Sequence, residues 1–186
     1  ATGTARSSLS LTDGQTYYFT IRAENGASIL SSASSSNGVF VDSSAPIPPA
    51  AVNDGAGTDV DFTSSSSDLT MNWEDASDPQ SGVVRYWYAA GTSAGATDVI
   101  DWTDNGLATS TSATGLSLAD LQKYYASVIA ENPLGLRSAP VSSDGITVDL
   151  TPPADITYVN DGTGADVDYS IYFDRISANW PPSRDD

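Results

Sequence analysis

Two acidic, glycine-rich loops contain the residues of this sequence that are best suited to bind a ligand. Their Asn and Asp residues are Asn53, Asp54, Asp59 and Asp61 in the first loop and Asn160, Asp161, Asp166 and Asp168 in the second. Calcium takes about six to eight oxygen ligands, and such a loop can fold carboxylates and carbonyls around one ion. The spacing differs from that of an EF-hand, which ends in a bidentate Glu. Two hypotheses stay open: a calcium site in each loop, or turns whose Asp side chains accept backbone hydrogen bonds at a sheet edge.

Two tryptophans, Trp87 and Trp102, are the side chains best placed to stack on sugar rings. Trp87 lies between Tyr86 and Tyr88, so strand alternation places it on the face opposite to both tyrosines. Either the indole packs against the segment 91–106, which includes Trp102, or it belongs to an exposed glycan-binding surface. Packing is the favoured interpretation, and a glycan-binding site at Trp87 and Trp102 is the alternative.

Catalysis finds little support among the residue types. Cys and His are absent, which excludes disulfides, Cys/His zinc sites and a Ser-His-Asp triad. The paired carboxylates of Glu74 and Asp75 could serve glycoside hydrolysis, but Pro181 and Pro182 replace them one repeat later. Ser and Thr are abundant, yet none has an activating partner beside it in the sequence. We expect that the chain is not an enzyme.

The charge of the chain is strongly acidic. Asp and Glu number 24 against 7 Lys and Arg, which gives a formal net charge of −17. Such a surface repels nucleic acid and anionic membranes and attracts divalent cations. No stretch approaches the roughly 20 apolar residues of a membrane-spanning helix. We therefore expect no nucleic-acid partner and no membrane insertion in this segment.

A tandem repeat with a period of about 107 residues organises the chain. LSLTDGQTYYFTIRAEN at 9–25 returns as LSLADLQKYYASVIAEN at 116–132, and VNDGAGTDVDF at 52–62 returns as VNDGTGADVDY at 159–169. Proline-rich stretches at 45–50 and 149–155 have the composition of stiff linkers. The predicted division is the C-terminal half of one module at 1–45, a complete module at 46–150, and the N-terminal half of the next at 151–186.

The two linkers suggest a second place for an ion. Asp42 and Asp149 each stand at the start of one linker, so a calcium ion that bridges consecutive modules would use the Asp of its own junction as a ligand. Calcium is thus the expected cofactor, and neighbouring modules of the same longer chain are the expected partners. Because edge strands of a sandwich can pair between chains, self-association into a filament or surface layer is a further expectation.

Short runs with period-two alternation predict strands at 17–23, 69–73, 84–90, 124–130, 145–149 and 176–180. In the run at 124–130, Tyr124, Ala126, Val128 and Ala130 share one face, which we predict to be the core. About seven short strands in a unit of this length indicate a β-sandwich. The predicted fold class is all-β, with tandem sandwich modules.

The order of these features resembles the fibronectin type III family, whose modules are immunoglobulin-like β-sandwiches. In the complete module an early-strand Trp is followed by a Leu-containing turn and then by a Tyr-x-x-x-Val/Ile-x-Ala-Glu-Asn strand, and each half contains its own part of this order. The resemblance implies core positions for Trp73 and Trp180, corner positions for Leu9 and Leu116, and inward positions for Tyr18 and Tyr125 or their neighbours. The acidic loops and the longer segment 91–106 resemble repeats of bacterial surface proteins.

These observations favour a non-catalytic structural or adhesive role. Tandem modules with few reactive residues would form a spacer, stalk or filament of a long extracellular protein, at the cell surface or secreted, and calcium would stiffen it. The alternative is a carbohydrate-binding or accessory module of a secreted polysaccharide-degrading enzyme, in which the tryptophans grip glycan.

Overall fold

The computed structural model describes residues 3–185, and every regular element in this range is a β-strand. The chain divides into two compact units, Ala1–Val148 and Asp149–Asp186. We call residues 3–45 of the first unit the N-terminal segment and residues 46–148 the central module; residues 149–185 are the C-terminal segment. Within the described range, no helix is long and apolar enough to cross a bilayer.

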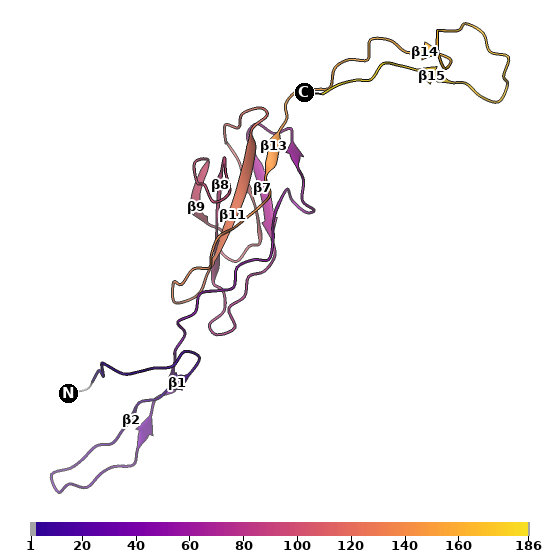
Figure 1. Ribbon diagram of the computed structural model, residues 1–186. Coiled ribbons are helices and arrows are strands. Elements are labelled where there is room, and N and C mark those ends of the chain that lie inside the picture. Colours follow the sequence, from indigo (N-terminus) through magenta and orange to yellow (C-terminus); the bar gives the residue numbers. More distant parts are fainter. Residues whose placement is uncertain (1–2, 186) are drawn as a thin grey trace. The chain divides into compact units, whose positions relative to one another are not determined.

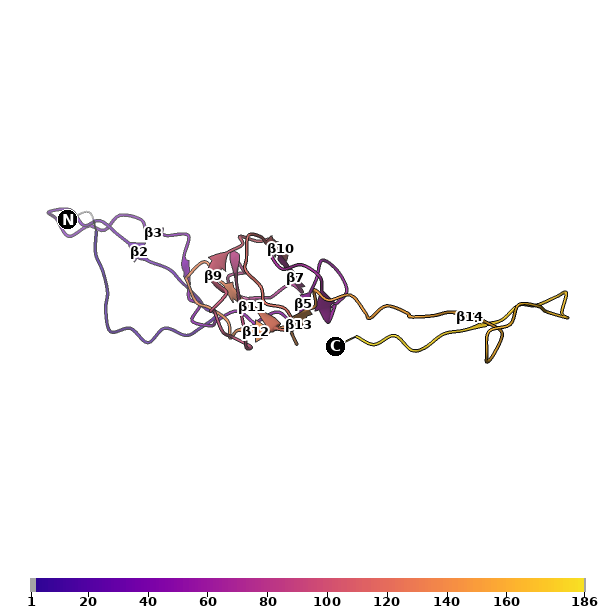
Figure 2. The same cartoon turned by 90° about the horizontal axis from the view of Figure 1, so that it is seen from above.

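Two sheets form the central module (Figure 1). The first sheet has the order β10-β7-β5, from β5 (Val52–Asp54), β7 (Leu69–Trp73) and β10 (Ser110–Ala113). The second has the order β6-β13-β11-β8-β9, with β12 also paired to β11. Its strands are β6 (Phe62–Thr63), β8 (Arg85–Gly91), β9 (Ile100–Asp104), β11 (Lys123–Glu131), β12 (Val141–Ser142) and β13 (Ile146–Val148). Seen from above, β10 and β7 lie on one side of the module and β12 and β13 on the other (Figure 2).

The core lies between these sheets. Along β7, Leu69, Met71 and Trp73 are buried while the residues between them are partly exposed, which is the alternation expected of a half-buried strand. The indole of Trp73 packs edge-on against the ring of Tyr86, with the ring centroids 5.7 Å apart. The predicted strand at 69–73 and the core position of Trp73 are therefore confirmed.

Strand β11 supplies the opposite wall of the core. Tyr124, Ala126, Val128 and Ala130 are all buried, as the alternation predicts. Of the adjacent tyrosines, Tyr124 rather than Tyr125 faces inward, and its hydroxyl oxygen accepts a hydrogen bond from the backbone N–H of Ala119 at 2.9 Å. Such a bond from a buried Tyr back to the preceding turn is the tyrosine corner of immunoglobulin-like sandwiches.

The corner position implied for Leu116 needs a correction. Leu118 is the buried leucine of this turn, while Leu116 is only partly buried and packs against the edge of the core. The backbone N–H groups of both leucines donate to carbonyls of the 66–67 turn, to Ser67 and Ser66 respectively, so that the chain runs extended here and alternate side chains differ in depth.

The segment 91–106 contains a strand that the sequence did not predict. Residues 100–104 form β9, which pairs antiparallel with β8 and includes a register shift between Tyr88 and Ala90. Apart from this addition, the predicted strands at 84–90 and 145–149 agree with β8 and β13 to within two residues at each end.

The two outer segments form short pairs of strands. In the N-terminal segment β1 (Thr16–Tyr17) pairs with β4 (Val39–Phe40), and β2 (Thr20–Ile21) pairs with β3 (Ser34–Ser35). In the C-terminal segment β14 (Asn160–Asp161) pairs with β15 (Ala178–Asn179). Trp180 and Leu9 are exposed, which corrects the core and corner positions implied for them. The reason is that neither segment contains the second sheet that would cover these side chains.

Candidate functional site

Asp54, in the first acidic loop, is buried against the turn that precedes β13. Its side chain has an exposed fraction of 2%, and it stands at the end of β5. One carboxylate oxygen accepts a hydrogen bond from the hydroxyl of Ser143 at 3.0 Å, and the other accepts from the backbone N–H of Gly145 at 3.1 Å. Asp54 therefore ties the first strand of the module to the turn that precedes its last strand.

The rest of this loop is held by side-chain to backbone hydrogen bonds. The Asp59 carboxylate accepts from the backbone N–H of Asp54 at 2.7 Å, and the amide of Asn72 donates to the carbonyls of Gly55 and Gly57, each at 2.9 Å. Asn53 donates to the side-chain oxygen of Asn72 at 3.2 Å. This arrangement agrees with the turn hypothesis. Asn72 is a loop-positioning residue that the sequence analysis did not single out, although the Asn-Trp pair returns at Asn179-Trp180.

Three carboxylates gather at this loop. One oxygen from each of Asp54, Asp59 and Asp144 lies within 4.8 Å of the other two. Asp144 was not predicted, because it comes 90 positions after Asp54 and only the folded turn brings it close. The predicted ligands Asn53 and Asp61 do not belong to this group of carboxylates. Asp61 forms a backbone hydrogen bond instead, in which its carbonyl accepts from the N–H of Thr147 at 2.8 Å.

Ionisation of all three carboxylates at once is electrostatically unfavourable, because they lie so close together. The pKa of Asp54 is raised to about 6, mainly by burial and also by the negative charges of Asp59 and Asp144, while the hydrogen bonds from Ser143 and Gly145 act in the opposite direction. The group offers hard oxygen donors of the kind that calcium takes, but the two oxygens of Asp54 already accept hydrogen bonds within the protein.

The second loop repeats these bonds without a third carboxylate. Asp166 accepts from the backbone N–H of Asp161 at 2.8 Å, and Asn179 donates to the carbonyls of Gly162 and Gly164 at 3.0 and 2.8 Å. Among residues 149–185, no group of three acidic side chains includes Asn160, Asp161, Asp166 or Asp168. The two loops therefore have the same turn and differ in what the neighbouring strands add.

A second cluster joins the N-terminal segment to the central module through Asn132. This residue is 1% exposed, and its side-chain nitrogen donates to Asp78 at 3.1 Å, to the carbonyl of Ser44 at 3.2 Å and to Asp42 at 3.3 Å. Asp42 also accepts from the hydroxyl of Ser81. The predicted ion-bridging residue Asp42 is thus hydrogen-bonded across the junction, while in the second unit Asp149 accepts from the backbone N–H of Thr151 at 3.1 Å.

Asp13 provides a further contact across this junction. Its carboxylate accepts from the backbone N–H of Ser43 at 2.6 Å and from the side-chain amide of Gln80 at 2.8 Å. The hydrogen bond from Gln80 is the main reason that the pKa of Asp13 is lowered to about 2, and the bonds from Ser43 add to the effect. Neither Asp13 nor Asn132 was predicted, since their partners lie 30 to 90 positions away.

Comparison with known proteins bears on the fold alone. No protein-family model and no curated protein matches the chain. Domains A168-A170 of titin superpose on 75% of this chain and 43% of their own, with a TM-score of 0.51 and 20% identity. The FN1-FN3 domains of chicken CNTN1 match 74% of this chain and 42% of their own, with a TM-score of 0.40 and 19% identity. The fold is fibronectin type III-like, within the immunoglobulin-like sandwiches.

The chain spans less than half the length of each of these solved chains. At such low identity the likeness to titin domains supports the all-β architecture and the resemblance noted in the sequence. Ligands, location and partners of the chain are therefore matters for proposal.

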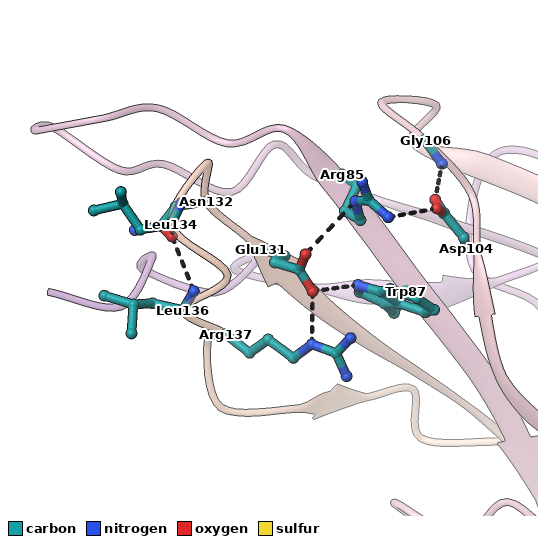
Figure 3. A network of polar contacts seen from close by, with 9 residues as sticks. All are labelled: Arg85, Trp87, Asp104, Gly106, Glu131, Asn132, Leu134, Leu136 and Arg137. Atoms are coloured by element: carbon teal, nitrogen blue, oxygen red, sulfur yellow. Dashed lines mark hydrogen bonds and ion pairs between the residues drawn. The ribbon is translucent and has the colours of Figure 1, made fainter. Parts of the chain in front are cut away.

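Trp87, on β8 of the fibronectin type III-like module, lies next to the charged side chains of Glu131, Arg137 and Arg85 (Figure 3). Its indole N–H donates to Glu131 at 2.8 Å, and the guanidinium of Arg137 lies 4.3 Å from the centre of the ring. Arg137 and Arg85 both pair with Glu131, at 2.7 and 3.6 Å. Although burial raises the pKa of Glu131, hydrogen bonds from Arg137 and Trp87 lower it below its ordinary value.

This arrangement limits how Trp87 could bind sugar. The guanidinium groups of Arg137 and Arg85 both lie over the indole, 4.3 and 5.7 Å from the ring centre, so they limit the room for a stacked sugar ring. Trp102 is partly buried on β9, and its backbone N–H donates to Asp101. Glycan binding by Trp87 and Trp102 stays a prediction.

Proposed function

We propose that the chain is a non-catalytic structural or adhesive part of an array of fibronectin type III-like modules, serving as spacer, stalk or filament. The junction between the N-terminal segment and the central module is the observation that carries this proposal. Asp13, Asp42 and Asn132 join the two parts by direct hydrogen bonds, and the linker residue Ile47 exchanges two backbone hydrogen bonds with Ser77. Such a linker limits the angle between modules, as an array that keeps its length requires.

The equivalence of the turns supports the same role. The hydrogen bonds of the acidic loop recur at Asp161 and Asn179, and the hydroxyl of Tyr17 accepts from the N–H of Thr12 at 2.8 Å, as Tyr124 does from Ala119. Each unit is built to the same plan and contributes length rather than a reaction. The architecture of tandem modules favours an extracellular surface or secreted location, and the absence of cysteine does not argue against it, because repetitive bacterial surface proteins often lack disulfides.

Amide hydrogen exchange tests the ordered junction. The backbone N–H of Ser43 donates to Asp13, and that of Ile47 donates to the carbonyl of Ser77 at 2.8 Å, so both should exchange slowly. Gln80→Ala should raise the exchange rate of Ser43 while the amides of β11 stay protected. Exchange of Ser43 and Ile47 at the rate of an unstructured peptide would overturn the proposal, because it would show a free hinge.

Calcium binding at Asp54, Asp59 and Asp144 is a second proposal, favoured by the close approach of their carboxylates. An ion there would offset the mutual repulsion of the three groups and stabilise the loop that fastens β5 to the last turn. A ligand that binds only the folded state raises the midpoint of thermal unfolding. We expect the midpoint to rise with calcium and to fall back with chelator.

Two variants make the calcium test specific. Asp144→Ala should abolish the rise, whereas Asp166→Ala in the C-terminal segment, where no third carboxylate joins the loop, should leave it unchanged. An equal midpoint with calcium and with chelator would show that the loop is a hydrogen-bonded turn and no more. That result would leave the junction, and with it the spacer role, unaffected.

A further inference from the structure

A pair of opposite charges closes the base of the turn that carries Asn132. Glu131, directly before Asn132, forms an antiparallel backbone bridge with Arg137, whose Nε lies 2.7 Å from a carboxylate oxygen of Glu131. Between them, the N–H groups of Leu134 and Leu136 both donate to the side-chain oxygen of Asn132 at 3.0 Å. Because the oxygen and nitrogen of an amide belong to one planar group, the turn also fixes the direction of the Asn132 nitrogen.

The junction depends on this nitrogen, because two like charges meet there. Asp42 belongs to the N-terminal segment and Asp78 to the central module, and the nitrogen of Asn132 donates to their carboxylates at 3.3 and 3.1 Å. Without a donor between them the two carboxylates would repel each other. The position of Asn132 therefore affects how firmly the N-terminal segment is held.

Further contacts fasten the base of the turn to the second sheet (Figure 3). The indole N–H of Trp87 on β8 donates to Glu131 at 2.8 Å. Arg85 lies 3.6 Å from the same carboxylate and 2.9 Å from that of Asp104 on β9. The guanidinium of Arg137 lies 4.3 Å from the centre of the Trp87 ring. The carboxylate of Glu131 thus links the turn to the strands beside β11.

The equivalent turn of the N-terminal segment forms without this ion pair. The side-chain oxygen of Asn25, one repeat before Asn132, accepts backbone hydrogen bonds of the same kind. Leu30 stands at the position of Arg137 and forms the backbone bridge with Glu24. The local hydrogen bonds of the turn therefore do not require opposite charges at its base. What the ion pair adds in the central module is a fixed place for the turn on the sheet.

We propose that the ion pair of Glu131 and Arg137 positions Asn132, and that ionic strength controls the stiffness of the junction through this pair. The proposal rests on the array function, since it concerns the junction on which that function depends. The side chain of Glu131 is 14% exposed and that of Arg137 is 45% exposed, so dissolved ions reach the pair from the arginine side. Salt screens such a contact, whereas the uncharged hydrogen bonds within the turn persist. The turn would then keep its shape but lose its fixed place on the sheet.

Amide hydrogen exchange of the full chain at low ionic strength tests the positioning role. Ile47, whose N–H donates to Ser77, reports on the junction, and the amides of β11 report on the module. Arg137→Leu copies Leu30 and should leave the turn intact. It should raise the exchange rate of Ile47 by about threefold to tenfold, since the lost ion pair is only partly shielded from water. The amides of β11 should exchange as in the unmodified chain, and Arg137→Lys, which keeps the charge, should restore most of the slow exchange.

Arg175→Leu is the matched control for the loss of one arginine. The guanidinium of Arg175 also lies over an aromatic ring, 3.8 Å from the centre of Tyr172, but this pair belongs to the C-terminal segment. The substitution changes the net charge by the same amount as Arg137→Leu. The exchange rate of Ile47 should therefore stay as in the unmodified chain.

A salt series tests the control by ionic strength. At about 1 M salt the screening length falls to about 3 Å, so the ion pair should contribute little. The ratio of the Ile47 exchange rates, Arg137→Leu over unmodified chain, should then approach one. The ratio is the informative quantity, because salt also screens the repulsion between Asp42 and Asp78 in both proteins.

The other outcomes separate this proposal from the array function. Equally slow exchange of Ile47 in Arg137→Leu and in the unmodified chain would overturn the positioning role and leave the spacer role intact. Fast exchange of Ile47 in the unmodified chain would overturn both, because no ordered junction would exist. Faster exchange throughout β11, an equally large effect of Arg137→Lys, or a ratio that does not change with salt would each show that Arg137 acts through packing rather than charge.

Discussion

The carboxylate of Asp54 accepts a hydrogen bond from the backbone N–H of Gly145, 91 positions later in the sequence. Gly145 presents this N–H from a backbone with a φ of +94°, and an added Cβ would lie 2.8 Å from the ring of Tyr125. The first and last strands of the module are thus joined by a buried acid, Asp54, and by a position, 145, that only glycine can occupy without strain.

Gly145→Ala should destabilise the module strongly. The positive φ costs a residue with a Cβ about 1–2 kcal/mol, and the contact with Tyr125 adds about 1–3 kcal/mol of overpacking. Gly82→Ala is the matched control, because Gly82 has a φ of +79° with nothing within 4 Å of the added Cβ. Urea unfolding should show the larger loss for Gly145→Ala. Equal losses would mean that the turn adapts and that its packing is unimportant.

Asp54 should make the stability of the module depend on pH. Its pKa is about 6 in the folded chain and near 3.8 when unfolded, so the folded state binds the proton more tightly. The stabilisation is complete below about pH 4 and is lost as the pH rises through 6. A shift of this size corresponds to about 3 kcal/mol.

Asp54→Asn isolates this effect from those of the other acids. Urea unfolding between pH 4 and 7 should give a stability difference, unmodified chain minus variant, that falls as the pH rises, because the variant has no proton to lose. Carboxylates with lowered pKa values, such as that of Asp78, act in the opposite direction in both proteins and cancel in the difference. A difference that is constant with pH would contradict the raised pKa.

Asn132→Ala should weaken the junction and the module together. The side chain donates to Asp42 and Asp78 and accepts from the N–H groups of Leu134 and Leu136, each at 3.0 Å, and leaving such groups unpaired costs about 1–3 kcal/mol. Asn25 accepts the same local bonds in the N-terminal segment, which lacks a core. Asn25→Ala should therefore leave the main unfolding transition unchanged. Equal effects of the two variants would show that the junction contacts are unimportant.

The titration of Asp13 reports directly on the junction. Because the hydrogen bond from Gln80 is the largest cause of its lowered pKa, Gln80→Ala should move the value from about 2 toward the ordinary 3.8. Carboxyl NMR titration measures this shift. Asp98, whose pKa is lowered by hydrogen bonds from Thr92, serves as the internal control and should not move. An unchanged Asp13 would mean that Gln80 does not reach across the junction.

Sequence patterns predicted the fold well because they report local geometry. Alternation identified the buried face of β11, and the spacing of Leu69, Met71 and Trp73 identified β7. The sequence did not show which of the adjacent residues Tyr124 and Tyr125 faces the core, because a shift of the strand by one residue would exchange their positions. Strand β9 was missed because its partly exposed residues show no clear apolar alternation.

The candidate site was predicted less well, because its contacts are long-range. Asp144 and Asn132 carry no local motif, and their partners are brought close only by the folded turns. The repeat contained a signal for part of the Asp54 contact: Asp54, Ser143 and Gly145 all return with the same residue type one period away. Residues that keep their type across a repeat while lying far apart in one unit are candidates for direct contact.

Small-angle scattering of tandem chains tests most directly whether these modules form an extended array. Residues 46–152 can be repeated two, three and four times without changing the period of about 107 residues, so that each junction keeps its Asp and Asn partners. The maximum dimension should grow by a constant increment of about 30–40 Å per module, the length of its longest strand plus the linker. A dimension that barely grows with module number, as in a compact particle, would contradict the spacer role.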